Sequence, residues 1–349
     1  MSDAQCAVVT VLGPIASEAV GPSLMHEHLI CDVTPPELAA LGGPEAAITL
    51  ETAFDIRYDW GIHHLGNHRL TSEDLAAAEL ARLGAAGGSV LVEVSTLGLA
   101  PDPAALARIS GRAGVHVVAG CGAYTEPYLP EGARAWSADD FARAMIVALT
   151  DGFVDTGVRA GIIGEIGCSW PWTALERRVM AGAVAAQRAT GAAITVHPGR
   201  DVQAPFEIAA FVAAEGGDLS RLVIGHIDRT LLDVEDAVRL ADRGVVVEYD
   251  FFGIEQAYYP FQDIDLPNDG QRLRALRRLI EAGHLERILI SQDICTRTRL
   301  SRYGGHGYGY LLKRVVPMMR ARGFTGGEVD TMLIGTPRRL LSRPSRGRR

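Results

Sequence analysis

The sequence predicts a (β/α)8 barrel of the TIM type, and two patterns support this prediction. Short apolar runs rich in β-branched residues alternate with longer stretches rich in Ala, Leu and Arg, eight times in succession. Such a β-then-α series is typical of a closed parallel barrel. Several runs, such as residues 288–290, are apolar throughout, as expected for strands buried on both faces. A doubly wound open sheet is the alternative fold that the same alternation allows.

The predicted strands are residues 24–29, 89–94, 115–119, 160–166, 193–197, 222–225, 245–249 and 287–291. Helices between them have recognisable starts, because Ser137 with Asp140 and Thr173 with Glu176 have the spacing of capping boxes. Long excursions follow the first strand, at residues 34–70, and the seventh, at residues 251–272. Loops after the carboxyl ends of barrel strands are where substrate-binding elements are expected.

No internal linker rich in Pro, Gly or Ser divides the chain, so we expect one barrel domain over residues 1–341. The last residues, 342–349, read SRPSRGRR, and this basic composition predicts a disordered tail.

Composition excludes several classes of function. The net charge of −8, from 34 basic and 42 acidic residues in 349, disfavours a nucleic-acid partner. No apolar run reaches the roughly 18 residues of a membrane-spanning helix, and the first residues do not resemble a signal peptide. Five widely spaced cysteines fit no disulfide framework. We therefore expect a cytoplasmic protein with a small-molecule substrate and no membrane partner, for which a homodimer is plausible.

Six residues of metal-ligating type lie at the carboxyl ends of the predicted strands. They are His26, His28, Glu165, His197, His226 and Asp293. A single histidine at a strand end is more often a polar rim residue, but a barrel brings all its strand ends around one mouth. Four imidazoles and two carboxylates there suit one or two divalent cations such as zinc, manganese or cobalt. The pattern therefore predicts a metal site at the mouth of the barrel.

The motifs around these residues resemble the phosphotriesterase family of the amidohydrolase superfamily. Within it, they are similar to the phosphotriesterase-related branch, once called resiniferatoxin-binding proteins. The resemblance covers residues 10–341, and its motifs are MHEHL (25–29), GIIGEIGCSWP (161–171), VHPGR with His197, GHIDR with His226, EYDFFG (248–253), SQD with Asp293 and YGGHGY (303–308).

The resemblance implies a binuclear centre, with zinc as the first expectation for its two ions. His26, His28 and Asp293 would hold the more buried ion. His197 and His226 would hold the other, and a hydroxide between the ions would attack the substrate. Asp293 would be the catalytic residue that accepts the proton.

Two departures from phosphotriesterases proper limit what is expected of this chain. Their bridging carboxylated lysine is replaced here by Glu165, and the only lysine, Lys313, lies far beyond the last strand. Their proton-shuttling histidine after strand seven is missing, because that stretch reads Asp250-Phe251-Phe252. Organophosphate hydrolysis is therefore expected only as a side activity.

Four residues near the mouth are candidate substrate contacts, namely Tyr124, Arg200, Arg229 and Arg297. Guanidinium groups suit an anionic substrate, although ion pairs with Glu93, Glu126 or Glu248 are an equal alternative.

The branch implies hydrolysis of small N-acyl amides of the N-acyl amino acid or N-acyl taurine type, or of an ester. A lactonase is the alternative enzyme. A non-catalytic binding protein is an alternative of another class, and Glu165 disfavours a deaminase or isomerase with a single metal ion.

Overall fold

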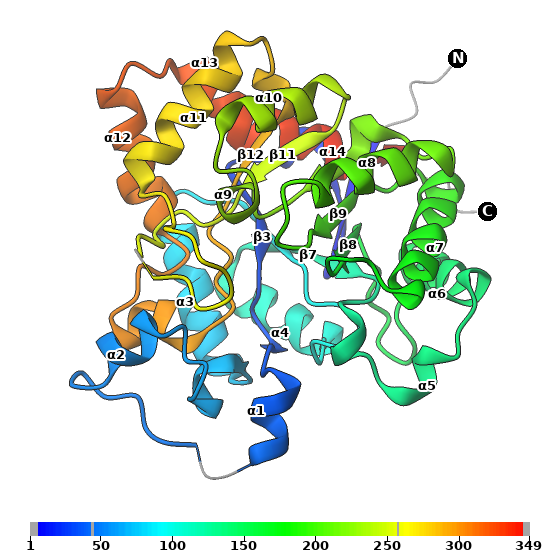
Figure 1. Ribbon diagram of the computed structural model, residues 1–349, viewed down its shortest axis with the longest axis horizontal. Helices are drawn as coiled ribbons and strands as arrows, with labels where there is room; N and C mark the ends of the chain where they lie inside the picture. Colours follow the sequence, from blue (N-terminus) through cyan, green and yellow to red (C-terminus); the bar gives the residue numbers. More distant parts are fainter. Residues whose placement is uncertain (1–5, 43–44, 257, 345–349) are drawn as a thin grey trace.

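The computed structural model describes residues 6–42, 45–256 and 258–344, and an eight-stranded parallel barrel forms its centre (Figure 1). All eight predicted strands are confirmed, with ends that differ by at most two residues. They are β3 (Ser23–Glu27), β6 (Val90–Glu93), β7 (His116–Cys121), β8 (Ile162–Gly167), β9 (Ile194–His197), β10 (Leu222–Ile224), β11 (Val246–Tyr249) and β12 (Ile288–Ile290). Each pairs in parallel with the next in this order.

The first and last barrel strands meet through residues at and beyond their ends. The backbone N–H of Asp293 donates to the carbonyl of His26 at 3.2 Å, and the Ser291 hydroxyl donates to the same carbonyl at 3.1 Å. The N–H of His26 in turn donates to the Ser291 hydroxyl at 3.0 Å. These bonds join the two edges of the sheet, so the barrel prediction is confirmed and the open-sheet alternative is wrong.

Both faces of the barrel strands are buried, and alternate residues enter different cores. Val118 and Leu289 belong to an inner cluster, whereas their neighbours Val117 and Ile290 pack with residues of the surrounding helices. This double burial explains why the strands read as apolar throughout.

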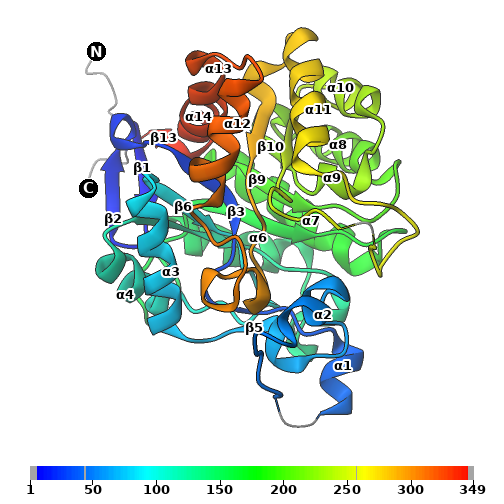
Figure 2. The ribbon, with the colours of Figure 1, turned by 90° about the vertical axis from the view of Figure 1, so that its left-hand side faces the viewer.

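Helices surround the barrel in the order of the chain (Figures 1 and 2). Their bounds are α1 (Pro36–Leu41), α2 (Ala53–Tyr58), α3 (Glu73–Ala85), α4 (Pro103–Ala113), α5 (Glu131–Arg134), α6 (Ala138–Thr150), α7 (Ala174–Thr190), α8 (Ala204–Ala214), α9 (Ile227–Thr230), α10 (Val234–Asp242), α11 (Asp269–Glu281), α12 (Val316–Ala321), α13 (Gly326–Asp330) and α14 (Thr336–Leu341). The capping boxes expected at Ser137 and Thr173 are present at the starts of α6 and α7.

The excursion after β3 contains α1, α2 and a two-stranded sheet. In that sheet β4 (Cys31–Asp32) pairs antiparallel with β5 (Arg69–Leu70). Residues 251–267, after β11, form no helix or strand among those that the structure describes. These two segments carry several of the residues considered below.

A small antiparallel sheet joins the two ends of the described chain. Its order is β13 (Ser342–Pro344), β1 (Cys6–Thr10) and β2 (Gly13–Ala16), and it lies on the opposite side of the molecule from α1 and α2 (Figure 2). Val8 of β1 and Leu340 of α14 share the inner core cluster, so these elements cover one end of the barrel. The prediction of a disordered tail from residue 342 is therefore wrong for Ser342–Pro344, and residues 345–349 lie outside the described residues.

None of the helices in the described ranges is long and apolar enough to cross a membrane. All five cysteines are free thiols in the described structure.

Candidate metal centre

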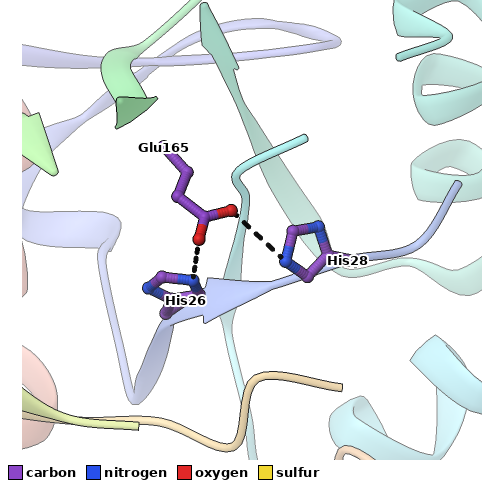
Figure 3. Close-up of side chains that lie close together, drawn as sticks. All are labelled: His26, His28 and Glu165. Atoms are coloured by element: carbon purple, nitrogen blue, oxygen red, sulfur yellow. Dashed lines mark ion pairs between the residues drawn. The ribbon is translucent and has the colours of Figure 1, made fainter. Parts of the chain in front are cut away.

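The six residues predicted to ligate metal lie together at the carboxyl ends of the barrel strands. Glu165 of β8 is at their centre. Its Oε1 is 2.8 Å from Nδ1 of His197 and 3.2 Å from Nε2 of His226. Figure 3 shows its contacts with the two histidines of the β3 segment, 3.5 Å from Oε1 to Nε2 of His26 and 3.8 Å from Oε2 to Nε2 of His28. The two oxygens of Glu165 thus face different imidazoles.

Asp293 follows β12 and stands beside the β3 histidines. Its Oδ1 is 3.4 Å from Nε2 of His28 and 4.0 Å from Nε2 of His26. Five of the six residues are buried, and only His197 is partly exposed. The fold therefore brings all six of these side chains together at one place.

The donor atoms fit a metal ion. The ligand atoms of His26, His28 and Glu165 lie within 4.8 Å of one another, and so do those of Glu165, His197 and His226. Both ring nitrogens of His26 are buried without a hydrogen-bond partner in the described structure. Buried imidazole nitrogens grouped with carboxylate oxygens are the donor set that borderline divalent cations prefer.

Asp250, directly after β11, is a member of the cluster that sequence reasoning missed. Its carboxylate is 2.9 Å from Nδ1 of His226 and accepts the His226 backbone N–H at 2.8 Å. Its Oδ2 is also 3.3 Å from Nδ1 of His26. Asp250 thus fixes the ring of one candidate ligand and approaches another. Its position after a barrel strand was a usable signal, but that stretch was considered only for its lack of histidine.

A second chain of contacts orients His28. Its Nδ1 is 2.9 Å from the Ser95 hydroxyl, which donates to Glu93 at 2.6 Å. The Nδ1 atom is therefore engaged, and Nε2 is the nitrogen that faces Glu165 and Asp293. Partners of this kind set the tautomer and orientation of a metal-binding imidazole.

Negative charge is concentrated in this buried space. Burial would raise the pKa of Glu165, but hydrogen bonds from His197, His226 and His26 outweigh it and hold that pKa well below its usual range. Burial would lower the pKa of His26, yet Asp250 and Glu165 raise it well above the ordinary value. The carboxylates thus attract positive charge to the imidazoles, and a divalent cation would supply that charge.

Two of the predicted substrate contacts lie beside His197. Arg229 is buried, and its Nη2 is 3.1 Å from Nε2 of His197 and donates to the Pro198 carbonyl at 2.9 Å. The Tyr124 hydroxyl is 3.3 Å from Nδ1 of the same histidine. Burial raises the pKa of Tyr124 well above its ordinary value, so its hydroxyl stays protonated.

Arg200 belongs to the same region. Its Nε donates to the Tyr259 hydroxyl at 2.9 Å, and its guanidinium lies 4.9 Å from the centre of the Phe261 ring. Neither Arg200 nor Arg229 forms an ion pair with any carboxylate of the described residues, so the alternative of rim ion pairs is not found for either.

Arg297 is placed differently. Its Nε donates to the Arg69 carbonyl at 2.7 Å, and its Nη1 pairs with Glu45 at 3.0 Å. The structure does not bring it to the candidate ligands. Arg299, two residues further on, is the arginine that reaches them, because its Nη1 donates to the Asp293 carbonyl at 2.6 Å.

An aromatic wall closes one side of the cluster, and sequence reasoning missed it as well. Phe251 lies 5.3 Å from His226 between ring centres. Trp60 packs against Phe251 at 5.8 Å and against Tyr259 at 5.2 Å. These residues come from the two long excursions whose positions, but not whose conformations, were predicted.

Comparisons with known proteins agree with this geometry. The model of the phosphotriesterase family matches residues 6–341. An N-acetyltaurine hydrolase of Bos taurus is 38% identical over 98% of this chain and 99% of its own length. The prediction of a hydrolase is thereby confirmed.

Solved structures resemble the chain over nearly its whole length. A resiniferatoxin-binding protein of Rhodobacter sphaeroides has 36% identity and a TM-score of 0.90, covering 96% of this chain and 94% of that one. A phosphotriesterase homology protein of Escherichia coli, with phosphate in its active site, has 28% identity and a TM-score of 0.76, covering 93% and 99%. The folded core, the clustered ligand-type residues and these matches show that the chain belongs to the phosphotriesterase family.

Proposed function

We propose that this enzyme hydrolyses the amide bond of a small anionic N-acyl compound, an N-acyl amino acid or N-acyl taurine. The observation that carries the proposal is a pair of arginines, Arg229 beside His197 and Arg200 beside Tyr259. Arg200 and Arg229 have no carboxylate partner among the described residues, so an anionic group of the substrate can take that place. The name of the bovine relative supports a sulfonate as that group.

Two divalent cations, with zinc as the first candidate, fit the donor set. His26, His28 and Asp293 would hold one ion, as their mutual distances support. His197 and His226 would hold the other, and Glu165 would bridge through its two oxygens. When bound, such ions polarise a carbonyl and lower the pKa of water from about 16 towards about 7.

Asp293 would be the proton carrier. Water adds to the acyl carbon, Asp293 accepts the proton that the water loses, and it returns that proton to the departing amine nitrogen as the C–N bond breaks. Hydrogen bonding by His28 lowers the pKa of Asp293 although burial opposes this, so the carboxylate starts the cycle ionised. The products are a carboxylic acid and an amine.

Tyr124, Arg200 and Arg229 would position the substrate. The two guanidinium groups would bind its sulfonate or carboxylate, and the protonated Tyr124 hydroxyl would donate a hydrogen bond near His197. Phe251 and Trp60 would surround the acyl group. We leave Arg297 out of this proposal because Glu45 and the Arg69 carbonyl already engage it.

The decisive experiment uses matched substrates on enzyme whose metal content has been measured. N-acetyltaurine and N-acetylglycine should be hydrolysed, and N-ethylacetamide, which lacks the anion, should be a poor substrate. Arg229→Met should raise KM for N-acetyltaurine by about tenfold or more and leave the slow rate for N-ethylacetamide unchanged. Arg302→Met, a change at an exposed arginine, is the control.

The same panel separates the alternatives. Rapid hydrolysis of lactones with no amide cleavage would replace the amidase proposal with a lactonase. Close to two zinc or manganese ions per chain would support the binuclear assignment, and close to one would contradict it. A cytoplasmic location and a homodimer remain our predictions, which cell fractionation and light scattering can check.

A further inference from the structure

A cavity with both charged and apolar walls lies near the candidate metal centre but contains none of the six candidate ligands. Its volume is about 300 Å³. It opens between α2, residues 253–256 after β11, and two residues of the segment after β12, Arg299 and His306. The charged groups in its wall are Arg57, Arg299 and Glu255.

The donors of this cavity are not matched by acceptors. Nε of Arg57 and Nε2 of His306 are both buried without a hydrogen-bond partner in the described structure. The Arg57 guanidinium otherwise donates through Nη2 to the Gly304 carbonyl at 3.2 Å. Arg57 forms no ion pair within the described ranges, and the ion pair of Arg299 is with Asp293, 3.9 Å from Nη1 to Oδ2.

The one acid in the wall does not neutralise these cations. Glu255 is exposed, and its Oε1 accepts the backbone N–H of Asp269 at 2.8 Å. Burial lowers the pKa of His306 to about 3, and the positive charges of Arg299 and Arg57 add to this effect. The imidazole is therefore neutral at physiological pH, and it is held firmly because its ring packs on Gly253 with no room for a Cβ atom.

Apolar surface adjoins the cations. The rings of Phe54 and Tyr58 stack at 5.8 Å on α2, and both residues line the cavity. Trp60, a member of the aromatic wall, adjoins the cavity, because its ring centre lies 4.4 Å from the Arg299 guanidinium. It also packs against Phe251 and Tyr259. The cavity is therefore a neighbour of the substrate region rather than a part of the ligand cluster.

We propose that this cavity binds a small organic acid. Its carboxylate or sulfonate would lie among Arg57, Arg299 and His306, and its apolar body would contact Phe54 and Tyr58. Bound acid would share Arg299 with the Asp293 carbonyl, so occupancy of the cavity would be coupled to the position of Asp293. The acid group could belong to a separate small molecule or to a second acidic end of a long substrate, since the recognising chemistry is the same.

Calorimetric titration of the metal-loaded enzyme with benzenesulfonate tests this binding directly. Besides binding at Arg200 and Arg229, which the proposed function implies, we expect a second saturable site. Arg57→Met should weaken this second site about tenfold or more, with Arg57→Lys intermediate because it keeps the charge but loses the planar donor. Arg302→Met, at an exposed residue of the same segment that does not line the cavity, should bind like the wild type. Arg200→Met should also retain this site.

Two outcomes would overturn the proposal. One is the absence of benzenesulfonate binding to the wild type. The other is binding that Arg200→Met abolishes and Arg57→Met leaves intact, because the acid would then lie in the substrate region. Neither binding measurement requires turnover. The acid site can therefore be confirmed even if the enzyme does not hydrolyse amides, and amide hydrolysis can be confirmed even if the cavity binds no acid.

Kinetics distinguish the two sources of the acid. A separate molecule predicts that benzenesulfonate changes kcat for N-acetyltaurine in the wild type and not in Arg57→Met. A second acidic end predicts that Arg57→Met raises KM for N-acetylglutamate and leaves KM for N-acetyltaurine unchanged. Suppose that Arg57→Met raises KM for N-acetyltaurine but not for N-acetylglutamate, and that the wild type does not bind benzenesulfonate. This result would contradict both sources of the acid and therefore the proposal.

Discussion

Glu165 shows how one residue type shapes the proposed centre. A carboxylated lysine cannot form there, because the only lysine of the chain is Lys313. The shorter glutamate still presents Oε1 to His197 and His226 and Oε2 to His28. Two oxygens that face different imidazoles are what a bridging carboxylate requires.

Asp293→Asn tests the proton carrier. The amide cannot accept a proton, so we expect kcat to fall by about 10²–10⁴-fold while far-ultraviolet circular dichroism stays unchanged. Metal content must be measured in parallel, because Asp293 is also a proposed ligand. Asp330→Asn, at an exposed position on α13, is the matched control. A rate near that of the wild type for Asp293→Asn would remove this residue from the mechanism.

Asp250→Asn tests a residue that acts through its neighbour. The variant weakens the bond that fixes the ring of His226, so we expect metal affinity to fall by about 10–100-fold. Competition with a chelator measures this affinity, and excess metal should restore most of the activity. If affinity is unchanged, Asp250 only supports the loop after β11.

At the scale of elements, sequence reasoning recovered the repeating units and missed the pairing between distant segments. Each barrel strand has its own local signal, an apolar run followed by a helical stretch. The strand β13 has none, because Ser342–Pro344 is polar and becomes a strand only by pairing with β1. No local sequence pattern predicts pairing with a strand at the other end of the chain.

Removal of residues 342–349 measures what β13 contributes. The truncation deletes the pairing with β1 and the Ser342 carbonyl that accepts from Arg221 at 3.2 Å. We expect Tm to fall by about 2–4 °C with kcat unchanged, because the strand lies at the far end of the barrel from the site. Removal of residues 345–349 alone separates the contribution of the strand, and an equal fall in Tm for this shorter truncation would contradict the prediction.

His68, directly before β5, predicts a pH dependence of stability. Burial lowers the pKa of this histidine in the folded protein, despite its 2.7 Å bond to the Gly61 carbonyl. The unfolded chain therefore binds the proton first as pH falls, and stability present above about pH 6.5 is lost below it. His68→Gln keeps a donor for Gly61 but does not titrate.

Urea unfolding of the two proteins at pH 7.5 and 5.5 measures this effect. The wild type should lose more of its free energy of unfolding than His68→Gln over that range. Equal losses would show that His68 does not contribute.

At the scale of the whole molecule, the convergence of the six candidate ligands followed from the fold. A parallel barrel places the carboxyl ends of all its strands at one mouth. Residue type and position on a strand were therefore enough to predict that the six side chains lie together. Trp60, Arg299 and Arg57 could not be predicted in the same way. Their positions depend on the conformation of long connections, where neither spacing nor alternation fixes a side chain.

Metal removal should affect the stability of the entire chain. The buried carboxylates repel one another without a cation, and an ion that binds only the folded state adds stability by mass action, about 2.7 kcal/mol at 100 times its Kd. Chelator should therefore lower Tm, and added zinc should restore it. An unchanged Tm on complete removal of metal would contradict the proposed centre.

The join between β3 and β12 has a consequence for synthesis of the chain. His26 leaves the ribosome early and Asp293 late, yet the backbone of one bonds to the other. A nascent chain that ends before β12 therefore lacks both its last candidate ligand and the edge that closes the barrel. Capture of metal by arrested chains of increasing length would report the moment at which the ring of strands closes.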